Sequence, residues 1–166
     1  MPPRRAASSP DSHSARRSDA TSTGSSSAGS ALRVSAERTA ANAAVARGVF
    51  DAFARRDGVA LRKLFHPDAT WTVPGQGVMA GVYRGCEEIF GFLGRLPGET
   101  DGTYRSELVD VLASDTHAAA LYRARGERAG RTLDLDQVLL FRIDDGAIVA
   151  VTALPTDPIA FERFWG

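Results

Sequence analysis

The chain has 166 residues, a length that fits one domain, or one domain with a tail. It is 43% hydrophobic and 24% charged, the composition of an ordinary globular protein. Its formal net charge of zero disfavours a nucleic-acid binder, because neutralising phosphates needs a basic surface. The single cysteine, Cys86, excludes an intrachain disulfide and favours a reducing compartment, so we predict a cytoplasmic protein. No apolar run approaches the ~18–20 residues of a membrane span, so we predict no membrane partner.

Residues 1–36 are rich in arginine, serine and alanine and contain no aromatic residue. Such a segment has too little apolar surface to offset the entropy of ordering. We therefore predict a disordered tail at residues 1–36, followed by a folded domain at residues 37–166. Two other interpretations stay open: a transit peptide, or upstream sequence translated ahead of a domain that begins just after Val34.

The first elements of the folded domain are predicted to be helices. Residues 43–53 carry apolar side chains at the spacing of one helix face, and Gly58 is suited to a left-handed helix stop. A short second helix is predicted at residues 59–65, before a His-Pro-Asp break and a strand at residues 69–73. A further helix is predicted near residues 87–96.

The pattern then changes to strands. Four are predicted, at residues 104–113, 116–126, 131–143 and 147–154, followed by a last helical turn at residues 159–165. Asp144-Asp145-Gly146, between the third and fourth of these strands, is a strong hairpin signal. Helices first and antiparallel strands afterwards predict an α+β fold with the helices on one face of the sheet.

Four segments carry a family resemblance: RRDGVALRKLF, HPDATWTVPG, GVYRG opening a helix, and DQVLLFRIDDGAIV. In this order they resemble the SnoaL-like and ketosteroid-isomerase-like branch of the nuclear-transport-factor-2-like superfamily. The resemblance implies a cone-shaped, curved antiparallel sheet with N-terminal helices packed over an apolar pocket, a cystatin-like α+β barrel. It also implies a homodimer formed through the outer sheet face. Because this fold serves isomerases, polyketide cyclases, hydratases and binding proteins, it does not decide the function.

The catalytic positions implied by the resemblance are mostly inert here. The proton-shuttling aspartate of ketosteroid isomerases falls on Val73, their oxyanion tyrosine near Val49, and their oxyanion aspartic acid near Gln137. The acid–base stretch of SnoaL-like cyclases corresponds to residues 150–153, which read Ala-Val-Thr-Ala, and a carboxylate of related epoxide hydrolases falls near Ala153. We therefore predict no catalytic residue by these known routes, since valine, alanine and amide side chains cannot act as a general base.

Strand parity predicts which side chains line the pocket. Val73 and Trp71 share one face of their strand, and Gln137 lies among inward-facing leucines of the third long strand. Gln137 either bonds a neighbouring backbone group or orients a polar group of a ligand. Tyr83 is predicted at the pocket mouth or wall, and Trp165 as a cap over the cone. The candidate substrate-binding residues are Trp71, Val73, Tyr83, Gln137 and Trp165.

The opposite parity predicts the outer face of the sheet. Asp134 and Asp136 are expected there, in ion pairs with one of the nearby arginines, Arg123, Arg125 or Arg142. Val138 and Leu140 share this parity, so we predict that a second copy covers the face in a homodimer. A monomer in light scattering at micromolar concentration would contradict this prediction.

Two function classes follow. The first is an enzyme of the isomerase, cyclase or hydratase type that acts on a small hydrophobic, carbonyl-bearing molecule, with no metal and no organic cofactor. His66 and His117 have no partner at metal-ligand spacing, so no metal site is predicted. The second is a non-catalytic protein that binds an apolar ligand or partner. A filled cone that serves only as a dimeric scaffold is a third possibility.

Overall fold

The computed structural model describes residues 24–166, and residues 1–23 lie outside the described part. In order along the chain, the elements are α1 (Gly24–Ala54), α2 (Gly58–Arg62), β1 (Phe65–Val73), β2 (Gly81–Arg84), α3 (Gly85–Glu99), β3 (Arg105–Ala113), β4 (His117–Arg128), β5 (Arg131–Asp144), β6 (Ala147–Pro155) and α4 (Pro158–Trp165). None of the helices in residues 24–166 is long and apolar enough to cross a membrane.

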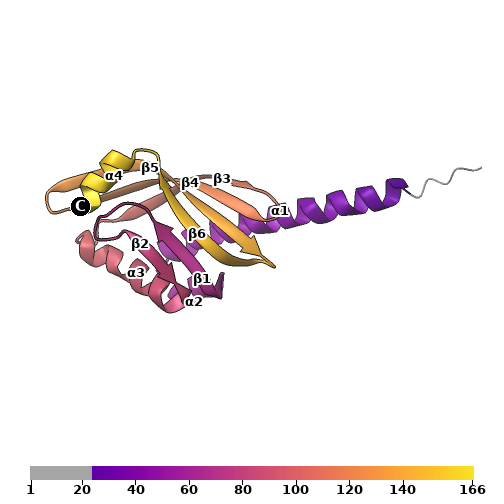
Figure 1. The fold of residues 1–166 in the computed structure, drawn as a ribbon, viewed down its shortest axis with the longest axis horizontal. Helices are drawn as coiled ribbons and strands as arrows, with labels where there is room; N and C mark the ends of the chain where they lie inside the picture. Colours follow the sequence, from indigo (N-terminus) through magenta and orange to yellow (C-terminus); the bar gives the residue numbers. More distant parts are fainter. Residues whose placement is uncertain (1–23) are drawn as a thin grey trace, which may run out of the picture.

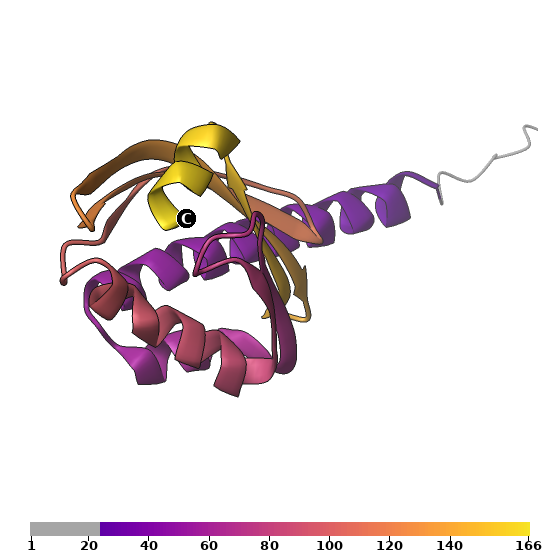
Figure 2. The same cartoon turned by 60° about the vertical axis from the view of Figure 1, so that its left-hand side comes forward.

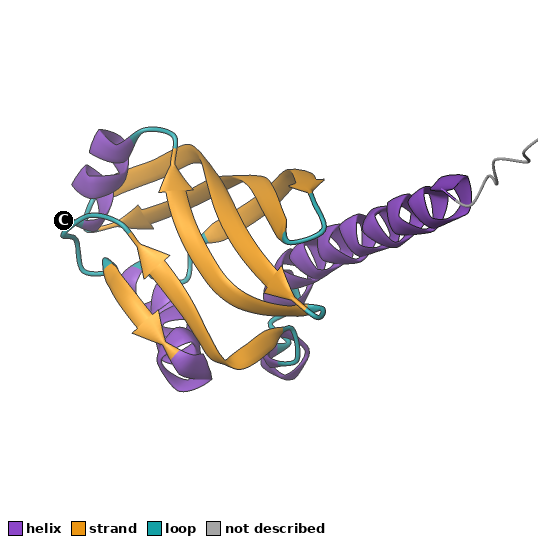
Figure 3. Ribbon diagram, turned by 45° about the vertical axis from the view of Figure 1, so that its right-hand side comes forward, coloured by secondary structure: helices purple, strands orange, loops and turns teal. Residues whose placement is uncertain are grey.

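The sheet confirms the predicted α+β class. Its six strands follow the order β2-β1-β6-β5-β4-β3, and both ends of this order are free, so the sheet is curved but not closed (Figure 3). The pairs β3–β4, β4–β5 and β5–β6 are antiparallel, as predicted. The pair β1–β2 is also antiparallel, whereas β1 and β6 run parallel. The sheet bends around α1 and α3, and α4 lies at one end of β5 (Figure 2).

Small side chains on the inner face of β4 let α1 approach the sheet. Ala118, Ala120 and Ala124 are at most 1% exposed and face the helix side. The apolar face of α1 packs in this region, where the Phe50 and Tyr122 rings lie 5.2 Å apart. The amide of the buried Asn42 donates to the Ser114 carbonyl at 3.0 Å, so a hydrogen bond also ties α1 to the β3–β4 turn.

The first helix differs from the disordered tail predicted for this part of the chain. Residues 24–36, predicted to be disordered, form the first part of α1, which runs across residue 37 and projects from the body of the domain (Figure 1). Within residues 26–36 every side chain but that of the half-buried Ser35 is exposed, so this part of the helix forms without burying an apolar face. The prediction considered only the capacity to bury apolar surface. The rest of the predicted tail lies outside the described residues.

Local turn chemistry explains where the other predictions succeed or fail. Asp145 and Gly146 have φ of 44° and 77°, as the predicted two-residue hairpin requires. The predicted stop at Gly58 is wrong: Arg56 takes the left-handed conformation with φ 56°, and Gly58 begins α2. The segment GVYRG opens helix α3 at Gly85, as predicted, but its first four residues pair with β1 as strand β2, which was not predicted.

Candidate functional site

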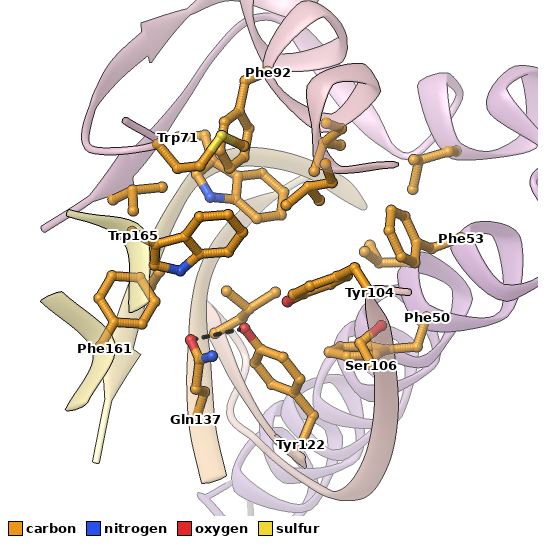
Figure 4. A pocket seen from close by; sticks show the side chains of 18 residues that line it. Phe50, Phe53, Trp71, Phe92, Tyr104, Ser106, Tyr122, Gln137, Phe161 and Trp165 are labelled. Carbon is orange, nitrogen blue, oxygen red and sulfur yellow. Dashed lines mark hydrogen bonds between the residues drawn. The ribbon is translucent and has the colours of Figure 1, made fainter. Parts of the chain in front are cut away.

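An apolar cavity lies between the helices and the inner face of the sheet (Figure 4). It has a volume of about 70 Å³, measured as the space open to the centre of a water molecule. Its lining residues come from every helix and from five of the strands or their flanking loops: Val49, Phe50, Phe53, Leu61, Trp71, Val73, Met79, Phe92, Leu93, Leu96, Tyr104, Ser106, Tyr122, Gln137, Leu139, Ala153, Phe161 and Trp165.

Helix α4 closes one side of the cavity with Phe161 and Trp165. Its position depends on the loop between β1 and β2. The backbone N–H of Val78 donates to the Trp165 carbonyl at 3.0 Å, and the N–H of Gln76 donates to the Glu162 carboxylate at 3.0 Å. The N-cap of α4 is Asp157, whose side chain accepts from the N–H of Ala160. The last helix is therefore a wall held against the β1–β2 loop by hydrogen bonds.

The polar part of the cavity is a hydrogen-bonded pair of side chains. Tyr122 on β4 and Gln137 on β5 are directly opposite each other in the antiparallel register. The Tyr122 hydroxyl donates to Oε1 of Gln137 at 3.1 Å, and the two residues are 5% and 2% exposed. The Gln137 amide nitrogen has no hydrogen-bond acceptor within residues 24–166, so its donor capacity is unused.

A second tyrosine, Tyr104, lies beside this pair, just before β3. Burial raises the pKa of its hydroxyl to about 12, although a hydrogen bond with Tyr122 acts in the opposite direction. Burial also raises the pKa of Tyr122 well above its ordinary value, and the neighbouring Tyr104 adds to the effect. Both phenols therefore stay protonated at neutral pH and act as hydrogen-bond donors, not as bases.

The indole nitrogen of Trp71 is a buried donor without a partner. Trp71 lines the cavity, is 5% exposed, and its Nε1–H meets no acceptor in residues 24–166. A buried donor left unpaired costs about 1–3 kcal/mol. Neighbouring side chains cover this nitrogen in the empty cavity, so an acceptor reaches it only if they move.

The described residues that line the cavity include no aspartate, glutamate, histidine, lysine or arginine. Within residues 24–166, no group of three His, Cys, Asp or Glu side chains is arranged to hold a metal ion. The cavity therefore offers apolar contact and hydrogen-bond donors, but no side chain that can accept a proton as a general base at neutral pH.

Four of the five predicted site residues line this cavity: Trp71, Val73, Gln137 and Trp165. Tyr83 does not, because its ring stacks on Phe92 with centroids 4.3 Å apart and its hydroxyl donates to the Met79 carbonyl at 2.8 Å. Whether the other four bind a ligand stays a prediction.

The partner of Gln137 differs from the backbone group that was one of its two predicted partners, and the other interpretation, that Gln137 orients a ligand, stays a prediction. Its amide oxygen accepts from the Tyr122 side chain and not from a backbone group. Tyr122 and Tyr104 were missed. The signal for Tyr122 was present, because pairing the hairpin around Ala129-Gly130 places it opposite Gln137.

Comparison with known proteins gives consistent matches. The profile of the SnoaL-like domain family matches residues 46–151. The Mycobacterium tuberculosis protein Rv0034, named as uncharacterised, is 39% identical over 120 residues, which are 72% of this chain and 92% of that protein. The structure of Bal32a, from a soil-derived mobile gene cassette, has a TM-score of 0.74 at 33% identity and covers 78% of this chain and 99% of its own. A Xanthomonas campestris protein of unknown function with a cystatin-like fold has a TM-score of 0.69 at 31% identity, over 74% of this chain and 95% of its own.

Proposed function

The chain belongs to the SnoaL-like domain family, within the nuclear-transport-factor-2-like superfamily, and we propose that it binds a small, mostly apolar molecule that carries a carbonyl oxygen. The observation that supports this proposal most directly is the Tyr122–Gln137 pair, a set of hydrogen-bond donors in an otherwise apolar cavity. The unused amide N–H groups of Gln137 would donate to the carbonyl oxygen. Apolar pockets with a few fixed polar groups are typical ligand sites.

The size of the cavity limits the ligand. Its volume of about 70 Å³ is less than half of the ~150 Å³ of an apolar cavity that binds benzene. A ligand of more than a few heavy atoms therefore needs side chains to move or must extend beyond the cavity.

Of the two function classes predicted from the sequence, the lining favours binding over catalysis. An isomerase or cyclase must move a proton, and no lining residue is a base at neutral pH. One observation favours the enzyme as a second candidate: Tyr104 and Tyr122 are protonated donors that could stabilise a developing oxyanion. The base would then have to come from the substrate itself or from a water molecule.

The binding proposal is tested with two probes of matched shape, cyclopentanone and methylenecyclopentane, which differ in having C=O or C=CH₂. The protein contains two tryptophans, and both line the cavity, so their indole N–H signals in a ¹H–¹⁵N spectrum report on its occupation. We expect both signals to shift with either probe and the ketone to bind more tightly. Replacing Gln137 by methionine should reduce the preference for the ketone about tenfold, the equivalent of one hydrogen bond of ~1.4 kcal/mol.

Two outcomes would overturn the proposal: saturation by the ketone without movement of either indole signal, or an unchanged preference in Gln137→Met. Exchange of the ketone α-hydrogens in D₂O, followed in the same samples, separates the two candidates. If the protein only binds the ketone, the α-hydrogens exchange at the rate measured in buffer alone. Exchange well above that rate, lost in Tyr104→Phe, would favour the enzyme.

We further propose that the outer sheet face is covered by a second copy of the chain. This face carries an apolar patch across β3 to β6 that includes exposed leucines: Leu112 at 61%, Leu140 at 38% and Leu154 at 44%. Beside it, Asp134 and Asp136 form ion pairs with Arg123 at 2.7 and 3.0 Å, as predicted, and Asp134 also pairs with Arg125. Exposed pairs of this kind contribute only about 0–1 kcal/mol each, so the apolar patch would supply most of the association energy.

Light scattering at about 10 µM is expected to show a dimer, because large exposed apolar patches commonly mark interfaces. Leu140→Glu places a charge in the middle of the patch and is expected to yield a folded monomer. Val59→Glu is the control, since Val59 is 70% exposed on α2, away from this face. A monomeric wild type, or a dimer that persists in Leu140→Glu, contradicts the proposal.

A further inference from the structure

The cavity adjoins a larger groove on the surface of the domain. The groove has a volume of about 660 Å³ and lies between the end of α1, α3 and the start of β3. The cavity and the groove share six lining residues: Phe53, Leu61, Leu93, Leu96, Tyr104 and Ser106. These shared residues form a common wall, so the groove is the approach to the cavity from this side.

Four of the six shared residues are only half-buried. Phe53, Leu93, Tyr104 and Ser106 are all in this class, whereas Leu61 and Leu96 are buried. The Tyr104 ring meets Phe53 edge-on at 6.4 Å, and its centroid is also 6.4 Å from that of Trp165 inside the cavity. Tyr104 therefore stands between the groove and the cavity, and a change in its rotamer would connect them.

The outer part of the groove carries more positive than negative charge. Its lining includes Arg56 and Arg105 but only one acidic residue, Asp57. The Asp57 carboxylate already accepts from the N–H of Ala60 as the N-cap of α2. Nη1 of Arg105 donates to the Gly102 and Tyr104 carbonyls at 2.8 and 2.7 Å, so its guanidinium is held at the edge of the groove.

Neither groove arginine is neutralised. Within residues 24–166, Arg56 and Arg105 take part in no ion pair. The acids nearest to Arg105 along the chain are Glu107, which pairs with Arg125 at 3.0 Å, and Asp101, and neither lines the groove. Guanidinium groups bind carboxylates through paired N–H donors, so this edge of the groove is suited to an anion.

We propose that the groove binds the anionic end of the ligand. The ligand class is then an amphipathic carboxylic acid: its carboxylate lies at Arg56 and Arg105, and its apolar part passes Tyr104 into the cavity. This inference rests on the proposed binding function and adds the charge and the orientation of the ligand. The limit that the cavity volume sets on the size of the ligand then no longer applies, because a molecule too large for the cavity extends into the groove.

The test compares octanoate with 1-octanol, which share the apolar chain and differ in charge, by titration of the two indole signals. We expect octanoate to bind about tenfold more tightly, and its affinity to fall between about 50 and 500 mM NaCl as salt screens the arginines. In the double variant Arg56→Gln and Arg105→Gln, octanoate affinity is expected to fall about tenfold while 1-octanol affinity is unchanged. Arg142→Gln removes one charge from the outer face of β5 and is the control.

Two results would overturn the inference: equal affinities for octanoate and 1-octanol, or an octanoate affinity that the double variant leaves unchanged. Cyclopentanone keeps the two proposals separate, since it is neutral and needs no arginine. If cyclopentanone moves the indole signals and octanoate binds no more tightly than 1-octanol, the groove site fails and the cavity site stands. If neither probe moves them, both fail.

Discussion

Replacing Gly77 by alanine is expected to lower the free energy of unfolding by about 1–3 kcal/mol or more, the cost of overpacking a well-packed site. A Cβ added at Gly77 would lie 2.7 Å from both the carbonyl carbon and the Cβ of Trp165. The contact is with backbone as well as side chain, so it cannot be relieved by a rotamer change alone. Helix α4 or the β1–β2 loop must shift, and the hydrogen bond from Val78 to the Trp165 carbonyl is strained with them.

Urea unfolding monitored by tryptophan fluorescence measures this effect, since both tryptophans lie at the cavity. Gly91→Ala is the matched control: Gly91 lies inside α3, and a Cβ there meets nothing within 4 Å. Alanine at this exposed helical position is expected to stabilise the protein by about 0.5–1 kcal/mol. If Gly77→Ala were as stable as Gly91→Ala, α4 would not be packed against the loop as described.

The strands were predictable because two independent signals agree on them. Alternating apolar residues and the turn residues Ala129-Gly130 and Asp145-Gly146 placed β3 to β6 within about two residues of their observed ends. The α+β class was predicted correctly from the order of the elements, and the SnoaL-like family from the resemblance of four sequence segments. The N-terminal part of α1 was missed because its side chains at residues 26–34 are exposed, so burial gave no signal.

Apart from Trp165 on α4, the predicted residues that line the cavity are those whose direction one strand decides. Trp71, Val73 and Gln137 follow from parity within their own strands. Tyr83 was misplaced because the sequence does not show that Phe92, from α3, packs on its ring. The position of Tyr104, at a strand start between two pockets, depends on the packing of α1 and α3 against the sheet.

Gln137→Met is expected to destabilise the protein by about 1–3 kcal/mol, since it leaves the buried Tyr122 hydroxyl without its acceptor. Tyr122→Phe removes the donor and keeps the aromatic contact with Phe50. Because the two side chains share one hydrogen bond, their costs should not add, and the double variant should be more stable than the sum of the single changes predicts. Urea unfolding of the wild type, the two single variants and the double variant measures this coupling. Additive costs would mean that the two side chains do not depend on each other.

The same four proteins separate structure from recognition. Replacing a buried polar pair by apolar groups of the same shape can be nearly neutral for stability. A double variant close to wild type in stability would therefore mean that the fold does not need Tyr122 and Gln137. If that variant also lost the preference for cyclopentanone over methylenecyclopentane, the polar pair would serve ligand recognition. A double variant that unfolds easily yet still prefers cyclopentanone would mean that Tyr122 and Gln137 stabilise the core. Tyr104 and Trp71 would then be the hydrogen-bond donors to the ligand.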